Sequence, residues 1–264
     1  MSRISGFSPM RDKGYLEAGL VAERRRRVKS NSSPERENRS KREGKVQESP
    51  VDVAFRKIKE MMYRHEIVPG QKLLYHELAR RLNMSITPII QALNRLQLLN
   101  IVYSERNKGY YVGEADPVEA RELFIAREAL ETYLVPSIVK NLTDKRLNAV
   151  EKAMKEHTKG LSIPQYGRIL MIRDTNFHLK IIECSENKVV YNMCKLIFEQ
   201  IYLKYRPEFM REPRLRKAAD EHEMILACLR ERDVRKTRRL IRQHIRNGSE
   251  HIVSSLLEDK NIEF

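Results

Sequence analysis

Four side chains in the C-terminal half of the sequence have the types and spacing of a metal site. Asp174 and His178 lie four residues apart, so on a helix they share one face. His222 and His244 lie on either side of Asp233, and two antiparallel helices joined there, each advancing ~1.5 Å per residue, would return the chain to the same level. One carboxylate with three imidazoles suits Zn, Ni, Mn or Fe without choosing among them. The spacing therefore allows a transition-metal site between helices.

The same residues also have a plainer explanation. The chain contains 7 His, and a single His is more often exposed, or satisfied inside a core, than a metal ligand. An Asp four residues before a His also occurs by chance on helices. The spacing alone leaves both explanations open.

The composition indicates the kind of chain that must position such a site. The 264 residues carry 51 Lys and Arg against 36 Asp and Glu, a net charge of +15. The sequence has no apolar run long enough for a membrane span, no export signal, and three cysteines without a metal or disulfide spacing. We therefore expect a cytoplasmic protein, without a membrane span, whose charge suits a polyanionic partner: nucleic acid or an acidic membrane surface.

The positive charge is concentrated toward the N-terminus. Residues 1–50 carry a net charge of +6, residues 51–113 carry +5, and residues 114–264 carry +4. Residues 1–50 are polar, lack apolar periodicity and contain the block Arg24–Arg27, so we expect a disordered basic tail. This tail is either an arm on nucleic acid, a spacer, or the product of a mis-set start.

Residues 51–115 are expected to form a winged helix-turn-helix. Three segments have helical periodicity, and two β-rich segments then flank a polar turn, which indicates a hairpin. The predicted helices cover 51–66, 75–82 and 85–99, and the predicted strands cover 101–104 and 109–112. In such a domain the third helix enters the major groove of DNA. Because helix–hairpin modules also bind proteins, an interaction module without DNA binding is an alternative.

Polar residues of this domain are the candidate DNA contacts. The third helix would present side chains to base edges, while the second helix and the hairpin tip would contact the backbone. The predicted set is Ser85, Thr87, Gln91, Asn94, Arg95, Arg81, Arg106 and Lys108.

Residues 116–260 are expected to form an all-α antiparallel bundle, which makes the fold class mainly α. The predicted helices cover 117–140, 143–159, 165–184, 188–209, 213–231 and 233–258. Pro136 lies late in the first of these and is expected to kink it.

The first of these domains resembles the DNA-binding domain of GntR-family bacterial transcription regulators. The resemblance rests on Pro69-Gly70-Gln71-Lys72-Leu73, on the stretch from Leu78-Ala79 to Leu96, and on Gly109-Tyr110-Tyr111-Val112. It implies a homodimer that binds a palindromic operator in double-stranded DNA. This sequence departs from the family pattern at Tyr75, Ile86 and Ile90, where the family has an acidic residue and two arginines. The operator should then differ from the usual one, or DNA binding should be weakened or depend on other positive groups.

The second domain resembles the FCD effector domain of the FadR subfamily. The resemblance rests on the segments 127–131, 174–178 and 184–187, on Glu221-His222, and on His244. It implies a divalent transition metal held by Asp174, His178, His222 and His244, and a small carboxylate effector beside it. Arg127 and Asn192 are the predicted effector contacts. For Arg127, an ion pair with Glu131 one turn along the same helix is an equal alternative.

These expectations combine into a ligand-responsive transcription regulator, most simply a repressor released by its effector. The rival class is a metal-dependent enzyme that uses the same Asp and three His. No nucleophile motif, phosphate loop or dinucleotide motif accompanies the four residues, and an attached DNA-binding domain favours regulation. The sequence names neither the effector nor the metal.

Overall fold

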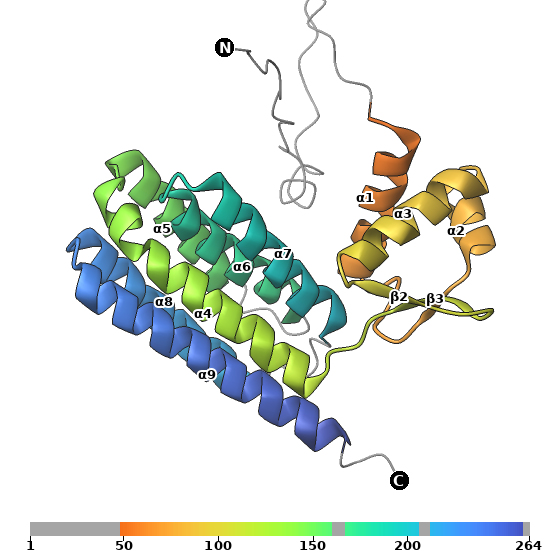
Figure 1. The fold of residues 1–264 in the computed structure, drawn as a ribbon. Coiled ribbons are helices and arrows are strands. Elements are labelled where there is room, and N and C mark those ends of the chain that lie inside the picture. Colours follow the sequence, from red (N-terminus) through yellow and green to blue (C-terminus); the bar gives the residue numbers. More distant parts are fainter. Residues whose placement is uncertain (1–47, 160–166, 206–211, 261–264) are drawn as a thin grey trace, which may run out of the picture. The chain divides into compact units, whose positions relative to one another are not determined.

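The computed structural model describes residues 48–159, 167–205 and 212–260, and Figure 1 shows the fold. The chain divides into residues 1–49 and a unit of residues 50–264. The predicted basic tail therefore lies almost entirely outside the described residues. Within the described ranges the protein is mainly helical with one small sheet, which confirms the predicted fold class.

The winged helix-turn-helix is present with one strand more than predicted. The helices are α1 (Pro50–Tyr63), α2 (Tyr75–Leu82) and α3 (Ile86–Leu98). The strands are β1 (Lys72–Leu73), β2 (Val102–Glu105) and β3 (Gly109–Val112), in the order β1-β3-β2 with antiparallel pairing. A strand of two residues, β1, is too short to show alternation, so only its pairing partner reveals it.

Residues with left-handed backbone define the turns of this domain. Asn83, with φ 51°, ends α2 before the tight turn into α3. His65, with φ 59°, follows the end of α1, which therefore stops at Tyr63 instead of continuing to residue 66. At the hairpin tip, Asn107 and Gly109 have φ of 62° and 104°. Asn tolerates left-handed backbone and Gly adopts it without strain. The local sequence therefore determines the turn after α2 and the turn of the hairpin.

The C-terminal helices form the predicted bundle. They are α4 (Pro117–Lys140), α5 (Asp144–Lys159), α6 (Gly167–Glu183), α7 (Lys188–Lys204), α8 (Glu212–Arg230) and α9 (Val234–Lys260). The long helices α4 and α9 run side by side (Figure 1). Helix α7 ends at Lys204, because Tyr205 adopts extended backbone. The predicted continuation to residue 209 otherwise lies outside the described residues.

Helix α4 continues through Pro136 as one helix. Proline lacks the N–H that would bond to the carbonyl of Thr132, four residues earlier. The Arg238 side chain of α9 supplies a donor instead, with Nε 3.2 Å from the Thr132 oxygen. A residue far along the chain therefore replaces the missing backbone hydrogen bond, which sequence periodicity could not reveal.

Two hydrophobic cores support the two domains. One joins α1, α2, α3 and the sheet, and its fully buried members include Ile58, Ile89 and Leu93. The other fills the bundle, with Phe177 and Phe198 near its centre. Leu203 of α7 belongs to the first core. The bundle core positions α6, α8 and α9, the helices that carry the four predicted metal ligands, and α4, which carries Arg127.

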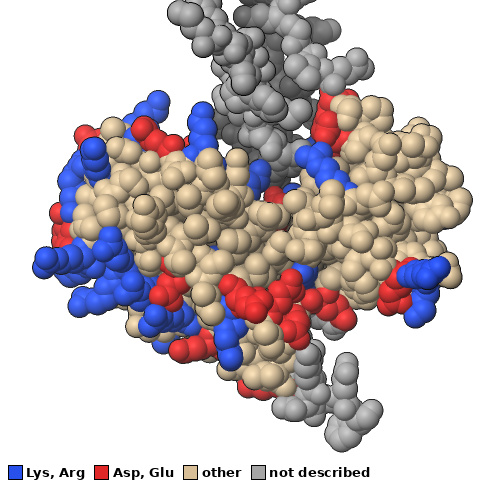
Figure 2. Space-filling model, in the orientation of Figure 1, with Lys and Arg blue, Asp and Glu red and all other residues tan. Residues whose placement is uncertain are grey.

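The charge of the bundle is close to balanced but unevenly distributed. Figure 2 shows Lys and Arg side chains gathered where α8 leads into α9. The sequence there contains eight Lys and Arg between residues 230 and 246: Arg230, Arg232, Arg235, Lys236, Arg238, Arg239, Arg242 and Arg246. Several are paired, as in the Arg242 and Arg246 contacts to Glu128. Among the described helices, none combines the length and apolar character needed to cross a bilayer.

Candidate metal centre and nucleic-acid interface

The four predicted metal ligands meet inside the bundle. Asp174 and His178 come from α6, His222 from α8 and His244 from α9, and one ligand atom of each lies within 4.8 Å of the others. All three histidines are buried, while Asp174 is partly exposed to the adjoining pocket. The four-residue spacing on α6 and the antiparallel α8–α9 pair thus produce the convergence that the sequence allows.

The distances between the ligand atoms suit one ion. His244 Nε2 lies 3.0 Å from His178 Nε2 and 3.2 Å from His222 Nε2. Asp174 Oδ1 lies 3.3 Å from His222 Nε2. Ligand atoms ~2.0–2.2 Å from one metal ion are separated by roughly 3.0–3.5 Å in octahedral or tetrahedral arrangements. These three pairs match that separation, while His178 Nε2 and Asp174 Oδ2 lie farther apart, at 4.0 Å.

Two carboxylates orient the imidazoles toward this centre. His178 Nδ1 lies 2.9 Å from Glu131 Oε2, and His244 Nδ1 lies 2.6 Å from Glu221 Oε2. An ionised carboxylate only accepts hydrogen bonds, so each Nδ1 carries the proton and each Nε2 presents a lone pair. Lone pairs facing each other across 3.0 Å repel unless a cation lies between them. The donor set therefore fits a divalent metal, with the carboxylate–histidine support common in such sites.

The charge states of the acidic groups are consistent with this arrangement. Burial alone would raise the pKa of Glu131, but the charge of Arg127, the neighbouring His178 and the hydrogen bonds from both lower the pKa to about 2. Burial likewise opposes ionisation of Asp174, while the neighbouring histidines lower its pKa. Burial, followed by the neighbouring His244 and His178, lowers the pKa of His222 well below its ordinary value. The carboxylates are thus ionised and His222 is neutral at pH 7, the forms that bind metals.

His222 Nδ1 is buried and has no hydrogen-bond partner among the described residues. Leaving a buried polar atom unpaired costs about 1–3 kcal/mol. A metal bound through Nε2 of the same ring would leave Nδ1 unpaired, in contrast to His178 and His244, whose Nδ1 atoms have carboxylate partners. The case for His222 as a ligand therefore rests on the position of its Nε2 near His244 and Asp174.

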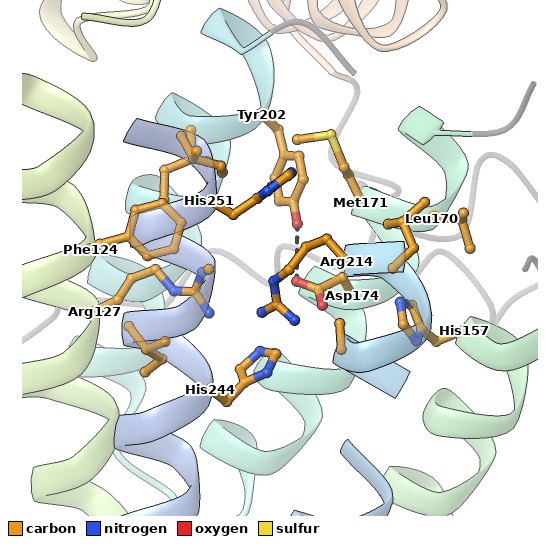
Figure 3. Close-up of a pocket in the computed structure, with 16 residues that line it drawn as sticks. Phe124, Arg127, His157, Leu170, Met171, Asp174, Tyr202, Arg214, His244 and His251 are labelled. Carbon is orange, nitrogen blue, oxygen red and sulfur yellow. Dashed lines mark hydrogen bonds between the residues drawn. The ribbon is translucent and has the colours of Figure 1, made fainter. Parts of the chain in front are cut away.

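A pocket opens beside the four ligands (Figure 3). It encloses about 50 Å³, and Asp174 and His244 form part of its wall. Arg127 of α4 and Arg214 of α8 line it together with Tyr202, His157 and His251. The space exceeds the ~10–15 Å³ needed for one water molecule and suits a small polar ligand.

Arg127 forms the ion pair considered from the sequence and also lines the pocket. Its Nε lies 2.9 Å from Glu131 Oε1, which is the ion pair along one helix. Its Nη2 is buried, has no hydrogen-bond partner among the described residues, and belongs to a side chain that lines the pocket. Burial opposes the charge of Arg127, but Glu131 and Asp174 raise the pKa, so the guanidinium is cationic. The group is held by Glu131 and still has a donor available to a ligand.

The structure does not support the predicted contact from Asn192. This residue lies on the exposed face of α7 and is absent from the pocket wall. Helix α7 presents Tyr202 to the pocket instead, and its hydroxyl donates to Asp174 Oδ2 at 3.2 Å. Since Asn192 and Tyr202 are ten residues apart, they lie on nearly opposite ends and different faces of α7.

Sequence reasoning missed Tyr202, Arg214 and the role of Glu221. Glu221 accepts from His244 and also pairs with Arg214, whose Nη1 lies 3.1 Å away. The position of Glu221 directly before His222 was the one feature in the sequence that could have drawn attention to it. Adjacent residues on a helix point in different directions, so this position did not show which histidine Glu221 supports. Only the packing of α8 against α9 shows that Glu221 supports His244.

The predicted DNA contacts lie on the surface of the winged domain. Ser85, Thr87 and Gln91 are exposed on α3, and Arg106 is exposed at the hairpin tip. Ser85 occupies the N-cap position of α3, yet its side chain makes no capping hydrogen bond. These groups are therefore available to a partner.

Other predicted DNA contacts are engaged within the domain. Asn94 Oδ1 accepts from the Tyr110 hydroxyl at 2.6 Å, and Arg95 pairs with Asp52 at 2.7 Å. Arg81 pairs with Glu66 at 2.9 Å.

Lys108 pairs with Glu105 at 2.7 Å. The hydrogen bond and the charge of Glu105 raise the Lys108 pKa. A phosphate would have to replace the acidic partners of Arg81, Arg95 and Lys108.

Comparison with known proteins identifies both domains. Residues 50–112 match the family described as bacterial regulatory proteins, gntR family, and residues 122–247 match the FCD domain. The solved structure of E. coli McbR/YncC has a TM-score of 0.69 and 22% sequence identity, and the similarity covers 81% of this chain and 99% of that one.

Three curated relatives cover most of the described chain. The uncharacterized HTH-type transcriptional regulator YdhC of Bacillus subtilis (strain 168) is 20% identical over 210 residues, 78% of this chain and 92% of YdhC. The HTH-type transcriptional regulator McbR of Escherichia coli (strain K12) is 26% identical over 171 residues, 62% of this chain and 75% of McbR. The HTH-type transcriptional repressor GlaR of the same strain is 22% identical over 203 residues, 72% of this chain and 90% of GlaR.

These relatives are named as transcriptional regulators. The DNA-binding match lies on the winged domain and the FCD match lies on the helical bundle. The chain belongs to the GntR family of transcriptional regulators, in the FadR subfamily with a C-terminal FCD domain.

Proposed function

We propose that this regulator binds a divalent transition metal through Asp174, His178, His222 and His244, and that a small carboxylate in the adjoining pocket controls its affinity for a palindromic operator. The single observation that carries the proposal is the buried, unpartnered Nη2 of Arg127 in a pocket whose wall includes two of the four metal ligands. Zn, Ni, Mn and Fe all suit the ligand set.

The chemistry of the pocket favours an anionic ligand. Arg127 and Arg214 both line it, and a guanidinium matches the two oxygens of a carboxylate. A bound divalent ion would offer open coordination positions to the same carboxylate. Tyr202 is buried and burial raises its pKa well above the ordinary value, so its hydroxyl stays protonated and can donate. The residues of this chain therefore bind, orient and desolvate an anion.

Helix α7 offers a physical connection from the pocket to the winged domain. Tyr202 contacts Asp174, while Gln200 donates to the Leu99 carbonyl at 2.9 Å. Glu199, one residue before Gln200, pairs with Lys59 of α1 at 2.7 Å. An effector that favours one position of α7 would thereby favour one arrangement of α1 and α3, which is the differential binding that allosteric control requires.

We propose repression relieved by the effector, because the relative GlaR is named a repressor.

A palindromic operator also requires a two-fold dimer. On α4, Val118, Ile125 and Tyr133 are large apolar residues exposed on one side of the helix, and they are the candidate dimer contacts. Light scattering should show a dimer, and Ile125→Asp should shift it toward monomer, whereas the exposed-residue control Val189→Asp should not.

Metal analysis tests the metal centre. The purified full chain should contain about one transition metal per chain by elemental mass spectrometry, and His222→Ala should lower this ratio at least tenfold. His76 is exposed on α2, so His76→Ala is the matched control and should retain metal. Equal metal content in the two variants would show that the ligand assignment is wrong.

Effector binding needs a separate measurement. Thermal-shift screening of small mono- and dicarboxylates against metal-loaded protein should identify a stabilising ligand, which should also release operator DNA. Arg127→Lys keeps a positive charge beside Glu131 but removes the guanidinium fork. It should therefore retain metal and bind the ligand at least tenfold more weakly. If Arg127→Lys leaves the ligand affinity unchanged, Arg127 does not bind the carboxylate.

A further inference from the structure

The first residue of the proposed recognition helix is an exposed isoleucine. Ile86 opens α3 and has 38% of its surface exposed. It stands between Ser85 and Thr87, which are both exposed. By contrast, Ile89 and Leu93 farther along α3 are fully buried. The apolar side chain of Ile86 is therefore only partly buried within the winged domain.

The position gives isoleucine no evident helical advantage. A β-branched side chain loses rotamer freedom in a helix, and the first turn favours residues that cap or carry negative charge. Exposed apolar surface also costs about 25 cal/mol per Å² relative to burial. Local helix physics gives isoleucine no advantage here, and the exposed part of its side chain leaves apolar surface available to a partner.

The neighbouring side chains narrow down what that surface is. On the third turn of α3, Asn94 and Arg95 are engaged with Tyr110 and Asp52. The first turn has the hydroxyls of Ser85 and Thr87 exposed, with the Ile86 side chain between them. In helix-turn-helix proteins the N-terminal residues of the recognition helix reach base edges in the major groove. Among the four bases, only thymine presents a methyl group there.

We infer that Ile86 contacts the 5-methyl group of a thymine in each half of the operator and so selects thymine at that position. The hydroxyls of Ser85 and Thr87 donate or accept hydrogen bonds at adjacent base edges or phosphates. This inference rests on operator binding by the winged domain. It is independent of the metal and the effector.

Removal of the methyl group from the DNA tests this contact directly. The operator is first obtained by selection from random duplexes with the full-length protein. Each thymine of the symmetric half-sites is then replaced by deoxyuridine, which keeps base pairing and removes only the methyl group. At one symmetric position the affinity should fall about fourfold for each half-site, the value of one buried carbon group. The same substitution should have little effect on binding by Ile86→Ala.

Leu98 provides a matched control on the same helix. It is 83% exposed at the opposite end of α3, so Leu98→Ala removes a comparable apolar side chain away from the first turn. This variant should show the full effect of deoxyuridine. The inference is overturned if deoxyuridine leaves the affinity of the wild-type protein unchanged at every position. It is also overturned if deoxyuridine lowers the affinity of Ile86→Ala as much as that of the wild-type protein. If the selection enriches no DNA sequence, operator binding itself is contradicted. A protein that binds the operator but does not respond to an effector would contradict only the proposed regulation.

Discussion

Arg95 is held by Asp52 across the winged domain, with Nη1 2.7 Å from Oδ1 and the guanidinium 4.3 Å from the centre of the Phe55 ring. Arg95 lies on α3, while Asp52 and Phe55 lie on α1. Before any DNA is bound, the most prominent cation of the proposed recognition helix is therefore already in an ion pair. Phosphate must compete with a carboxylate that is already in place, which reduces the net gain from the contact.

Asp52→Asn should therefore tighten DNA binding, because Arg95 loses its competing acidic partner. Arg95→Ala should weaken binding and reduce the slope of log affinity against log salt by about 0.9. Fluorescence anisotropy over a range of salt concentrations measures both quantities. In the double variant the gain from Asp52→Asn should disappear. A gain that persists without Arg95 would show that Asp52 acts on DNA by simple repulsion.

Glu131→Gln should weaken metal binding by about 10-fold to 100-fold, because it removes the anionic acceptor that orients His178. Titration with a fluorescent chelator as competitor measures this change. Glu223 is exposed on α8 beside His222, so Glu223→Gln removes an equal charge without touching an imidazole. Similar losses in the two variants would indicate that bulk charge, and not the Nδ1 acceptor, sets the affinity.

The buried thiols should resist alkylation in the native protein. Burial raises the pKa of Cys184 to about 11 and that of Cys194 to about 12. Because the thiolate is the nucleophile, labelling by iodoacetamide at pH 8 should be at least 100-fold slower than in denaturant and should accelerate as pH rises toward these values. Mass spectrometry of digested protein reports each site. Rapid native labelling of Cys194 would contradict its burial within the bundle.

The Arg238 contact to Thr132 can be tested through Pro136. Arg238→Ala should lower the free energy of unfolding by about 1–2 kcal/mol, since it leaves the Thr132 carbonyl without its side-chain donor. Pro136→Ala restores a backbone N–H that can bond to the same carbonyl. The cost of Arg238→Ala should consequently shrink in the Pro136→Ala background. Denaturant unfolding of the four proteins gives the coupling, and strict additivity would show that Arg238 acts elsewhere.

Most of the fold followed from local sequence signals, while the supporting contacts did not. Helical periodicity and turn residues located the helices, and the four-residue spacing of Asp174 and His178 predicted their shared face. The carboxylates of Glu131 and Glu221 could not be assigned, because their role depends on how α4 and α8 pack against α6 and α9. The position of Asn192 could not be predicted for a related reason: only the packing of α7 shows that Asn192 is exposed while Tyr202 lines the pocket.

The hydrogen bond from Arg238 to the Thr132 carbonyl makes the bonding of α4 depend on the last helix of the bundle. The Thr132 carbonyl and the Arg238 side chain are 106 residues apart. During synthesis, the last turns of α4 emerge before α9, so the Thr132 carbonyl gains this donor only when the final described helix docks. Closing so long a loop is an entropic cost that local helix formation does not repay. Helix α9 therefore has two roles in the bundle, because Arg238 bonds to the Thr132 carbonyl of α4 and His244 joins the other three predicted ligands.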